Sequence, residues 1–444
     1  MHPKLQACWQ RVLDSKGGSS AVIDAVTERV WTFEEINARA DAWLARHPQA
    51  RGGVGQVWCL ALADRAEWLA VFLASIKTGA VVLPVEPDAS HLLGAQAKRS
   101  GASLLVAEAG VEALTGGTRH KNCLLIKLTS GTTGEPKPLP FTEAEMLADG
   151  EQIMQSMSIT TADRNFAVIP LGHSYGLGNL VLPFFMVGVP IVLGSSPYPQ
   201  VMLEELTRYP CTVLPLVPPL VKALAAVGAE SAGLQGMRLI LSAGSALKPE
   251  IARQFHAQTG RRVHNFYGSS ETGGICFDRS GQAAQTDGAV GSPLVGVELS
   301  LTEAGAVHIR SEALCHALYP AGVATLHDFG CIDEGGVLRL TGRHADIVKI
   351  AGRRMSLSEI EAALCALEGV EDVYVTVREG RSGETRCVAI FAGSAEADAI
   401  RRQLAAGLPD WKVPKALRRV DQITNNARGK KDRQAMERVV DALI

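Results

Sequence analysis

A twelve-residue stretch, LTSGTTGEPKPL (128–139), concentrates groups that bind anions. It holds four hydroxyl side chains, two glycines and a lysine in a chain otherwise rich in Ala, Leu and Val. Glycines let backbone N–H groups turn toward a bound group, hydroxyls add donors, and the ammonium adds a charge. The stretch therefore predicts a phosphate-binding loop. Its members are Thr129, Ser130, Gly131, Thr132, Thr133, Gly134 and Lys137.

Two familiar phosphate motifs do not fit this chain. A Walker A loop needs Gly-Lys followed by Ser or Thr, whereas Lys137 is followed by Pro138. The segment YGLGNL (175–180) lacks the third glycine of a dinucleotide fingerprint. An unrelated ATPase or kinase is therefore poorly supported. Taken alone, the stretch also fits a surface Gly/Thr loop between a strand and a helix.

Composition limits the classes of protein to consider. The chain has 444 residues, 47% of them apolar and 20% charged, which suits two or three domains with a large core. A formal net charge of −2 gives no reason to expect nucleic-acid binding. Nine scattered cysteines without C-x-x-C spacing argue against a disulfide framework or structural zinc and favour a reducing compartment.

The N-terminus and the longest apolar run bear on the location of the protein. The first residues show no signal-like apolar stretch. The run NLVLPFFMVGVPIVLG (179–194) contains two prolines and is shorter than the ~20 residues that a spanning helix needs. It predicts a buried helix–strand unit rather than a transmembrane segment. We expect a cytoplasmic protein.

The elements that must position the loop alternate between strand and helix. Residues 31–47 have helical apolar spacing after Thr32, an N-cap candidate with Glu35 three residues on. A buried-strand run (57–64), a helix (66–79) and another strand (80–87) follow. This rhythm predicts largely parallel sheets covered by helices. Further strand runs are expected at 166–171, 190–194, 211–218 and 239–244.

The pattern changes after about residue 288. Short antiparallel strands with glycine turns are expected within 297–311 and 336–343. A more charged stretch of α+β character follows residue 345. These changes place a domain boundary at 343–346.

Further segments appear in a defined order around the loop: SAGSAL (242–247), HNFYGSSETGG (264–274), LTGRHADIVKIAGRRMSLSEIE (340–361) and NNARGKKDRQAM (425–436). With the loop, they resemble the adenylate-forming superfamily of AMP-dependent synthetases and ligases. Its members include acyl- and aryl-CoA synthetases, acyl-carrier-protein synthetases, adenylation domains and luciferases. The loop matches that family's T-S-G-T-T-G-x-P-K string, and the resemblance covers essentially the whole chain.

This resemblance implies an α/β fold with two domains. Residues 1–344 would form a large domain of mainly parallel sheets covered by helices, with a small β-barrel-like subdomain, that binds ATP and the acid. Residues 345–444 would form a small mobile α+β domain that carries the catalytic lysine. Rotation of this domain would pivot at position 345, where the usual Asp or Lys is Ala345.

The resemblance also implies roles around the nucleotide. Tyr267 and Gly268 would lie near the adenine, Ser270 would contact the α-phosphate, and Glu271 would hold Mg²⁺ against the phosphates. A carboxylate beside a triphosphate agrees with the preference of Mg²⁺ for one or two carboxylates plus phosphate oxygens. The remaining expected neighbours of ATP are Gly244, Ser245 and Ala246 at the adenine, and Asp328 and Arg343 at the ribose.

Two matches depart from the family pattern or leave its register open. Leu326 and His327 replace the usual Thr-Gly before Asp328. In the last segment, the glycine match makes Lys430 the catalytic lysine, and the doubled lysine leaves Lys431 as the alternative. After domain rotation, Lys349 and Gly352 would border the path of the pantetheine thiol.

The acid pocket is expected around PLGHSYGLGNLVLPFF (170–185), which resembles the acyl-pocket segment of acyl-CoA and acyl-carrier-protein synthetases. His173 takes the position beside the substrate carbonyl. Ser174 stands where amino-acid-activating domains commonly place an Asp, which disfavours an amino acid. The other pocket candidates are Leu177, Val181, Leu216, Val217, Pro218 and Gly273, and the apolar ones suit a hydrocarbon or aryl acid.

The expected activity is ATP-dependent conversion of a hydrophobic carboxylic acid to an acyl-adenylate, with transfer to a thiol. The thiol would belong to CoA or to the phosphopantetheine of an acyl carrier protein. A non-catalytic acyl- or nucleotide-binding relative is a further alternative. Its support is limited to the altered residues Leu326, His327 and Ala345.

Overall fold

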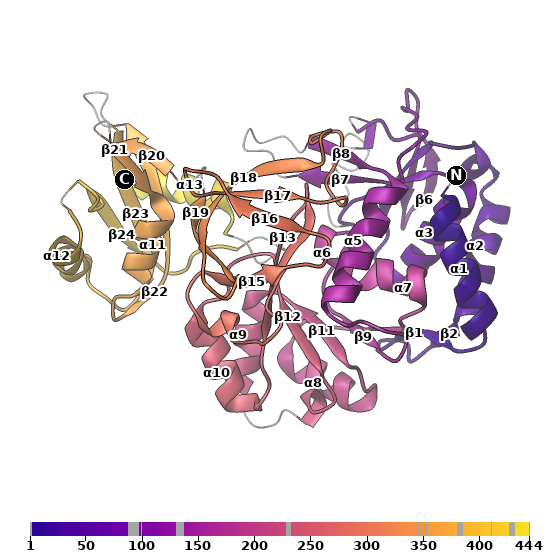
Figure 1. Ribbon diagram of the computed structural model, residues 1–444, viewed down its shortest axis with the longest axis horizontal. Helices are drawn as coiled ribbons and strands as arrows, with labels where there is room; N and C mark the ends of the chain where they lie inside the picture. The colour runs from indigo at the N-terminus through magenta and orange to yellow at the C-terminus, as the bar shows by residue number, and fades with distance from the viewer. Residues whose placement is uncertain are drawn as a thin grey trace. The chain divides into compact units, whose positions relative to one another are not determined.

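The computed structural model describes residues 2–87, 97–98, 100–129, 137–227, 232–343, 347–350, 353–379, 385–409, 411–425 and 431–443 (Figure 1). Contacts within the chain define two compact units. Unit 1 comprises Met1–Leu299 and Ile309–Ala324, and unit 2 comprises Ser300–His308 and Thr325–Ile444. The predicted boundary at 344/345 lies outside the described residues, so it stays a prediction.

The first sheet of unit 1 carries the phosphate-loop stretch. Its strand order is β6–β5–β3–β4–β7–β8. The inner pairs are parallel, while β6 and β8 pair antiparallel at the edges. All five residues of β3 are buried, as expected for a strand covered on both faces. The strands are β3 (Val57–Ala61), β4 (Val81–Pro84), β5 (Leu104–Ala107), β6 (Gly110–Ala113), β7 (Leu125–Thr129) and β8 (Lys137–Phe141).

In the second sheet of unit 1, the strands follow the order β15–β14–β13–β12–β11–β9–β10–β1–β2. The run from β13 to β1 is parallel, and β14, β15 and β2 are antiparallel additions. The strands are β1 (Ser20–Asp24), β2 (Val30–Thr32), β9 (Asn165–Ala167), β10 (Ile191–Leu193), β11 (Val213–Leu216), β12 (Leu239–Ser242), β13 (His264–Ser269), β14 (Gly273–Phe277) and β15 (Ala289–Pro293).

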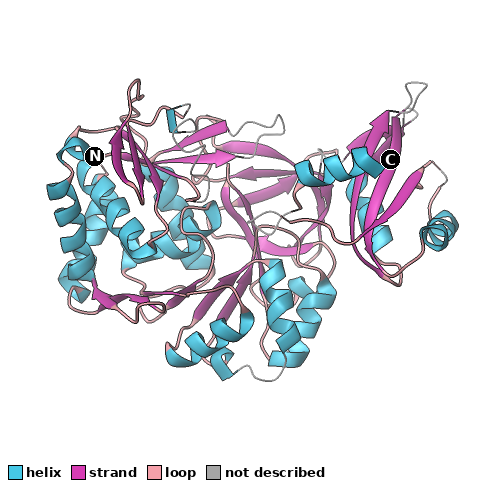
Figure 2. Ribbon diagram, turned by 180° about the vertical axis from the view of Figure 1, so that it is seen from behind, coloured by secondary structure: helices cyan, strands magenta, loops and turns pink. Residues whose placement is uncertain are grey.

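Helices cover these sheets, as the alternating sequence predicts (Figures 1 and 2). α2 is capped by Thr32 and Glu35 in the expected reciprocal box, and the backbone N–H of Glu35 donates to Thr32 Oγ1 at 3.1 Å. The helices are α1 (Pro3–Lys16), α2 (Phe33–Arg46), α3 (Arg65–Thr78), α5 (Glu143–Ser156), α6 (Ser174–Gly176), α7 (Leu182–Val187), α8 (Pro199–Arg208), α9 (Pro218–Val227) and α10 (Pro249–Thr259). Short helical turns occupy Pro48–Arg51, Ala232–Leu234 and Ala283–Gln285.

The apolar run 179–194 forms the predicted buried helix–strand unit. A π-helical turn, η2 (Leu177–Val181), joins α6 to α7, and β10 completes the run. Phe184 and Phe185 are fully buried against Trp9 of α1. Among the described residues, no helix is long and apolar enough to cross a bilayer.

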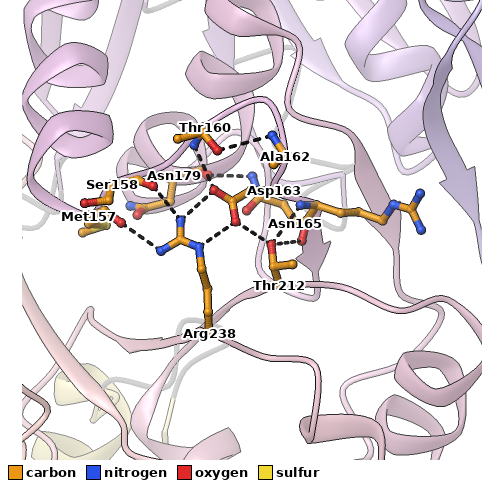
Figure 3. Close-up of polar contacts among 10 residues, drawn as sticks. Met157, Ser158, Thr160, Ala162, Asp163, Asn165, Asn179, Thr212 and Arg238 are labelled. Carbon is orange, nitrogen blue, oxygen red and sulfur yellow. Dashed lines mark hydrogen bonds and ion pairs between the residues drawn. The ribbon is translucent and has the colours of Figure 1, made fainter.

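An acid–base pair with a buried carboxylate and a partly exposed arginine fixes the amino ends of the second sheet (Figure 3). Asp163, whose side chain is 4% exposed, accepts two hydrogen bonds from Arg238, at 2.7 and 2.6 Å. The Thr212 hydroxyl and the Thr160 N–H also donate to this carboxylate. The Arg238 guanidinium reaches the carbonyl of Met157 as well. Every named group thus has a partner, and the cluster ties together the segments that enter β9, β11 and β12.

Unit 2 has the predicted α+β character. β18 (Val323–Ile332) and β19 (Leu338–Arg343) form an antiparallel ladder. β20 (Ile347–Ile350) pairs with β21 (Arg353–Ser356), and β22 (Val370–Glu379), β23 (Thr385–Gly393) and β24 (Ala416–Val420) form a third sheet. Apolar residues of α11 (Leu357–Cys365) and α12 (Ala397–Gly407) cover one face, and α13 (Arg433–Leu443) covers the other. The division between the units passes through β16 (Glu298–Leu301) and β17 (Ala306–Arg310). The barrel-like arrangement of the subdomain stays a prediction.

Candidate active site

Four predicted segments meet at the carboxyl edge of the second sheet. β9, β11, β12 and β13 are parallel neighbours, so the residues that follow them lie along one edge. Ligands of open α/β sheets bind at such an edge. The segments are 170–174 after β9, Val217 after β11, 244–246 after β12, and the Tyr267–Ser269 end of β13.

The residues at this edge are accessible to a ligand. Gly244, Ser245 and Ala246 are exposed, and Gly244 has a φ of +91° that suits glycine. A Cβ at Gly244 would lie 3.7 Å from Val217 Cγ1, so the predicted adenine segment and an acid-pocket residue are neighbours. Tyr267 is half-buried and Gly268 is exposed on the adjacent strand.

Glu271 lies in the tight turn between β13 and β14. Its N–H donates to Ser269 Oγ at 3.3 Å, and its carbonyl accepts from the N–H of Cys315 at 3.0 Å. Thr272 is fully buried and its hydroxyl contacts Ser269 Oγ at 3.0 Å. The backbone of the turn is therefore fixed. Within the described part of the chain the half-buried Glu271 carboxylate makes no hydrogen bond, which suits a cation ligand. Ser270 is half-buried in the same turn.

The phosphate-loop stretch closes a β-hairpin. Thr129 at the end of β7 pairs with Lys137 at the start of β8. The stretch thus connects two antiparallel strands rather than a strand and a helix. Positions 130–136, with the predicted Ser130, Gly131, Thr132, Thr133 and Gly134, lie outside the described residues, and so do the side chains of Thr129 and Lys137.

His173 stands at the start of the predicted acid pocket and has a carboxylate neighbour that sequence reasoning missed. Its Nε2 lies 2.5 Å from Glu86 Oε1, in the loop that follows β4. The carbonyl of His173 accepts from the N–H of Leu177 at 2.7 Å, which begins the short α6. Ser174 is half-buried, while Leu177 and Val181 are fully buried.

A second buried acid–base pair, which sequence analysis also missed, lies behind the Glu271 turn. Asp149 of α5 accepts from the N–H of Gly274 at 2.9 Å. A Cβ at Gly273, whose φ is +69°, would clash with Asp149 Oδ1. A Cβ at Gly178 of η2 would lie 3.4 Å from Oδ2. Asp149 therefore lies between the predicted acid-pocket helix and the β13–β14 hairpin.

Lys127 of β7 is the basic member of this pair. Its side chain is buried, with Nζ 4.0 Å from the centre of the Phe141 ring. Among the described residues, no hydrogen-bond acceptor reaches Nζ. Burial lowers the pKa of Lys127, while the charge of Asp149 acts in the opposite direction. Burial likewise raises the pKa of Asp149, against the effects of Lys127 and the Gly274 N–H.

Signals for these residues were present in the sequence. Lys127 interrupts the apolar run LLIKL that precedes the loop, where a strand position would bury it. Asp149 follows Met146 by three residues and precedes Ile153 by four, which places it on the buried face of a helix. Neither Lys nor Asp is ordinarily buried without a partner.

In unit 2, the two predicted ribose residues come together. Asp328 of β18 is 6% exposed, and the register of β18 and β19 places it directly opposite Arg343. The side chains of Arg343 and Lys349 lie outside the described residues, as do Ala345 and Gly352. These positions stay predictions.

The alternative catalytic lysine, Lys431, is bound within its own unit. Its Nζ donates to Glu361 Oε2 at 2.8 Å and to the carbonyl of Val373 at 2.5 Å. Lys430 lies outside the described residues. Because the Lys431 ammonium is already hydrogen-bonded within unit 2, Lys430 remains our first candidate for the catalytic lysine.

Comparison with known proteins identifies the family. The AMP-binding enzyme family matches residues 112–308, and the C-terminal domain of AMP-binding enzymes matches residues 359–430. The matched ranges include the phosphate-loop stretch, the Glu271 turn and Lys430. The chain belongs to the AMP-binding, adenylate-forming enzyme family.

Named relatives agree with this assignment. The chain is 25% identical to 2-succinylbenzoate–CoA ligase of Geobacillus kaustophilus, over 93% of this chain and 94% of that one. It is 26% identical to a dimodular nonribosomal peptide synthase of Bacillus subtilis, over 91% of this chain and 20% of that much longer one. The fold is similar to that of ATP-bound MatB from Rhodopseudomonas palustris, with a TM-score of 0.83, 22% identity and 99% of each chain covered.

Proposed function

We propose that the chain is an AMP-forming acid–thiol ligase, which activates a carboxylic acid with ATP and transfers the acyl group to a thiol. The observation that carries this proposal is the carboxyl edge of the second sheet. The candidate residues at this edge lie at or just after the ends of neighbouring parallel strands, or in the β13–β14 hairpin. They are His173, Gly244–Ala246, Tyr267 and Glu271. Membership of the AMP-binding enzyme family supports the same activity.

The residues suit the needs of adenylate formation. A carboxylate is a poor acyl donor, because its leaving group would be oxide. Attack of its oxygen on the α-phosphorus breaks the bond to the β-phosphate bridging oxygen, releases pyrophosphate and leaves an acyl-adenylate. This step depends mostly on in-line positioning and charge neutralisation. We assign Ser130–Gly134 and Lys137 to the β- and γ-phosphates, and Lys430 to the carboxylate and α-phosphate.

Mg²⁺ fits the Glu271 turn. The carboxylate is half-buried, its backbone is fixed on both sides, and it makes no hydrogen bond to the described residues. When bound there with ATP, Mg²⁺ would neutralise phosphate charge. Asp328 and Arg343 are assigned to the ribose, and their cross-strand pairing supports this shared role.

The acid is expected to be largely hydrophobic, either alkyl or aryl. Leu177 and Val181 are fully buried in the helical segment that follows His173. The His173 ring lies beside the start of this segment, with its Nε2 2.5 Å from Glu86 Oε1. His173 is therefore assigned to the carboxyl end of the acid.

In the second step, the thiol sulfur attacks the acyl carbon and AMP leaves with one oxygen of the original carboxylate. CoA is our first candidate for the thiol, since a relative that matches over 94% of its own length is named as a CoA ligase. A carrier-protein phosphopantetheine is the alternative, supported by the similarity to a peptide synthase. Lys349 and Gly352 are assigned to the thiol path.

Pyrophosphate release across a panel of fatty, aryl and amino acids, each with and without CoA, tests the proposal. We expect acid-dependent release that rises with CoA. Release that ignores CoA would indicate a carrier-protein acceptor, and the absence of release with every acid would contradict the ligase assignment. Lys137→Ala and Glu271→Gln are the variants to compare, because both should reduce acid-dependent release by about 10²-fold or more.

A further inference from the structure

The pair formed by Lys127 and Asp149 differs from an ordinary buried ion pair. Both side chains are nearly inaccessible, with 3% and 2% of each residue exposed. They interact electrostatically, yet no direct ion pair joins them in the described structure. Burying a charge without a hydrogen-bond partner is costly. The Lys127 ammonium, which lies over the Phe141 ring and has no acceptor among the described residues, therefore points to a ligand group that accepts a hydrogen bond from it.

The position of Asp149 connects this pair to the acid pocket. Its carboxylate faces two glycines, Gly178 and Gly273, on the two elements assigned to the pocket. A Cβ at Gly273 would clash with Asp149 Oδ1. A Cβ at Gly178, in contrast, would lie in ordinary contact with Oδ2 at 3.4 Å and would clash with Ile153 Cδ1 at 2.7 Å. A π-helical turn at Leu177–Val181 places Gly178 there, and such turns are frequent at functional sites. The absence of a side chain at Gly273 thus leaves room for the Asp149 carboxylate.

The charges around Lys127 indicate which kind of group would bind. Besides Asp149, Glu271 and Glu145 act on the ammonium. Glu145 also accepts hydrogen bonds from the backbone N–H and ring Nδ1 of His316, at 2.7 Å each. With this much negative charge nearby, a further anion would be opposed. A hydroxyl group can accept from an ammonium and donate to a carboxylate at the same time.

We propose that Lys127 and Asp149 form a polar subsite of the acid pocket that binds a hydroxyl group on the carbon skeleton of the acid. This inference rests on the proposed function and narrows its substrate to hydroxylated acids, whose remaining surface is apolar. The hydroxyl oxygen accepts from Lys127 Nζ and its hydrogen is donated to Asp149. An acid without the hydroxyl leaves the Lys127 ammonium without an acceptor and Asp149 with the Gly274 N–H as its donor, so the subsite discriminates against it.

The test is pyrophosphate release with matched acids. The panel contains benzoate with 3- and 4-hydroxybenzoate, butyrate with 3-hydroxybutyrate, and isophthalate as the dicarboxylic member. We expect the best hydroxylated acid to exceed its parent in kcat/KM by about 100-fold or more. Lys127→Met and Asp149→Asn should each reduce that ratio by about 10-fold or more, mainly through the KM of the hydroxylated acid.

A control comes from the other acid–base pair of unit 1, formed by Arg238 and Asp163. Arg238→Met lies at the opposite edge of the second sheet and should leave the ratio of hydroxylated to parent acid unchanged. Thermal unfolding of every variant identifies those that fail to fold, and the double variant Lys127→Met/Asp149→Leu removes both charges together. In that variant the preference for the hydroxyl should disappear.

Three results would overturn the inference while leaving the proposed function intact. In the first, pyrophosphate is released but parent acids equal or exceed their hydroxylated partners. In the second, isophthalate exceeds every hydroxylated acid. In the third, the hydroxyl preference persists in Lys127→Met and Asp149→Asn. If no acid in the panel produced pyrophosphate release, that result would instead contradict the proposed function and the inference with it.

Discussion

The two acid–base pairs of unit 1 that involve a buried carboxylate have opposite designs. At the amino ends of the second sheet, Arg238 and Asp163 make direct hydrogen bonds, and neighbouring backbone and hydroxyl groups complete the cluster (Figure 3). Behind the Glu271 turn, Lys127 and Asp149 make no direct ion pair in the described structure, and the ammonium lacks an acceptor. The first arrangement stabilises the fold. The second arrangement is less stabilising, because it leaves the Lys127 ammonium without an acceptor, and we assign Lys127 and Asp149 to ligand binding.

The pKa directions express the same contrast. Burial tends to raise the pKa of Asp163, but hydrogen bonds from Arg238, Thr160 and Thr212 outweigh it and lower that pKa. For Asp149 burial prevails and raises the pKa. A carboxylate with enough donors stays charged, whereas one with few donors is driven toward its neutral form.

The largest expected effect on stability follows from breaking the complete pair. Arg238→Ala leaves the Asp163 carboxylate buried without its main donor. The free energy of unfolding should fall by about 3 kcal/mol, measured by chemical denaturation at neutral pH. A loss below about 1 kcal/mol would show that the cluster does not hold together the segments that enter β9, β11 and β12.

A smaller loss is expected where a side chain meets the incomplete pair. Gly273→Ala introduces a Cβ at a φ of +69° that clashes with Asp149. It should cost about 2 kcal/mol. In an Asp149→Ala background this clash is absent. Gly273→Ala should therefore lower the free energy of unfolding less in that background than in the wild type, as a double-mutant cycle would measure. Strict additivity would contradict the contact.

The dependence of stability on pH should have opposite signs at the two carboxylates. Because its folded pKa lies below the ordinary value of 3.8, Asp163 stabilises the protein above pH 3.8, and this contribution is lost on further acidification. The pKa of Asp149 is raised in the folded protein. Asp149 therefore lowers the free energy of unfolding above pH 3.8, and this destabilisation grows until the pH passes the folded pKa.

Unfolding of Asp163→Asn and Asp149→Asn between pH 3 and 7 compares the two carboxylates. Relative to wild type, the deficit of Asp163→Asn should shrink at the acid end. The relative stability of Asp149→Asn should rise with pH. Parallel profiles for the two variants would remove the contrast.

The smallest change is expected for Lys127→Met. The substitution replaces an ammonium without an acceptor by an apolar chain of similar length, and it removes the charge that opposes the rise in the pKa of Asp149. The free energy of unfolding should rise by up to about 1 kcal/mol. A loss of more than about 2 kcal/mol would mean that Lys127 is a structural partner rather than part of a binding subsite.

The sequence was sufficient for the fold and for the residues on regular motifs. Strand–helix alternation predicted both sheets of unit 1, and the Thr32–Glu35 box placed the start of α2. The resemblance of the segment 264–274 to a family motif singled out Glu271, and the structure places this residue in the turn between β13 and β14. Asp328 and Arg343 were assigned separately, and the strand register then paired them.

The sequence was insufficient for contacts between distant segments. Glu86 and His173 are 87 positions apart and belong to loops after strands of different sheets. The surroundings of Asp149 are determined by how α5 packs against η2 and β14. A buried Lys or Asp can be suspected from its apolar neighbours, but its partner depends on tertiary packing that no local pattern encodes.

The central claim is that an acid oxygen attacks the α-phosphorus of ATP. Incubating ATP and CoA with a turned-over acid labelled with ¹⁸O in its carboxylate, and then analysing AMP by mass spectrometry, tests it directly. We predict one ¹⁸O atom in the phosphate of AMP. Unlabelled AMP, or label in orthophosphate with ADP as the nucleotide product, would contradict the account.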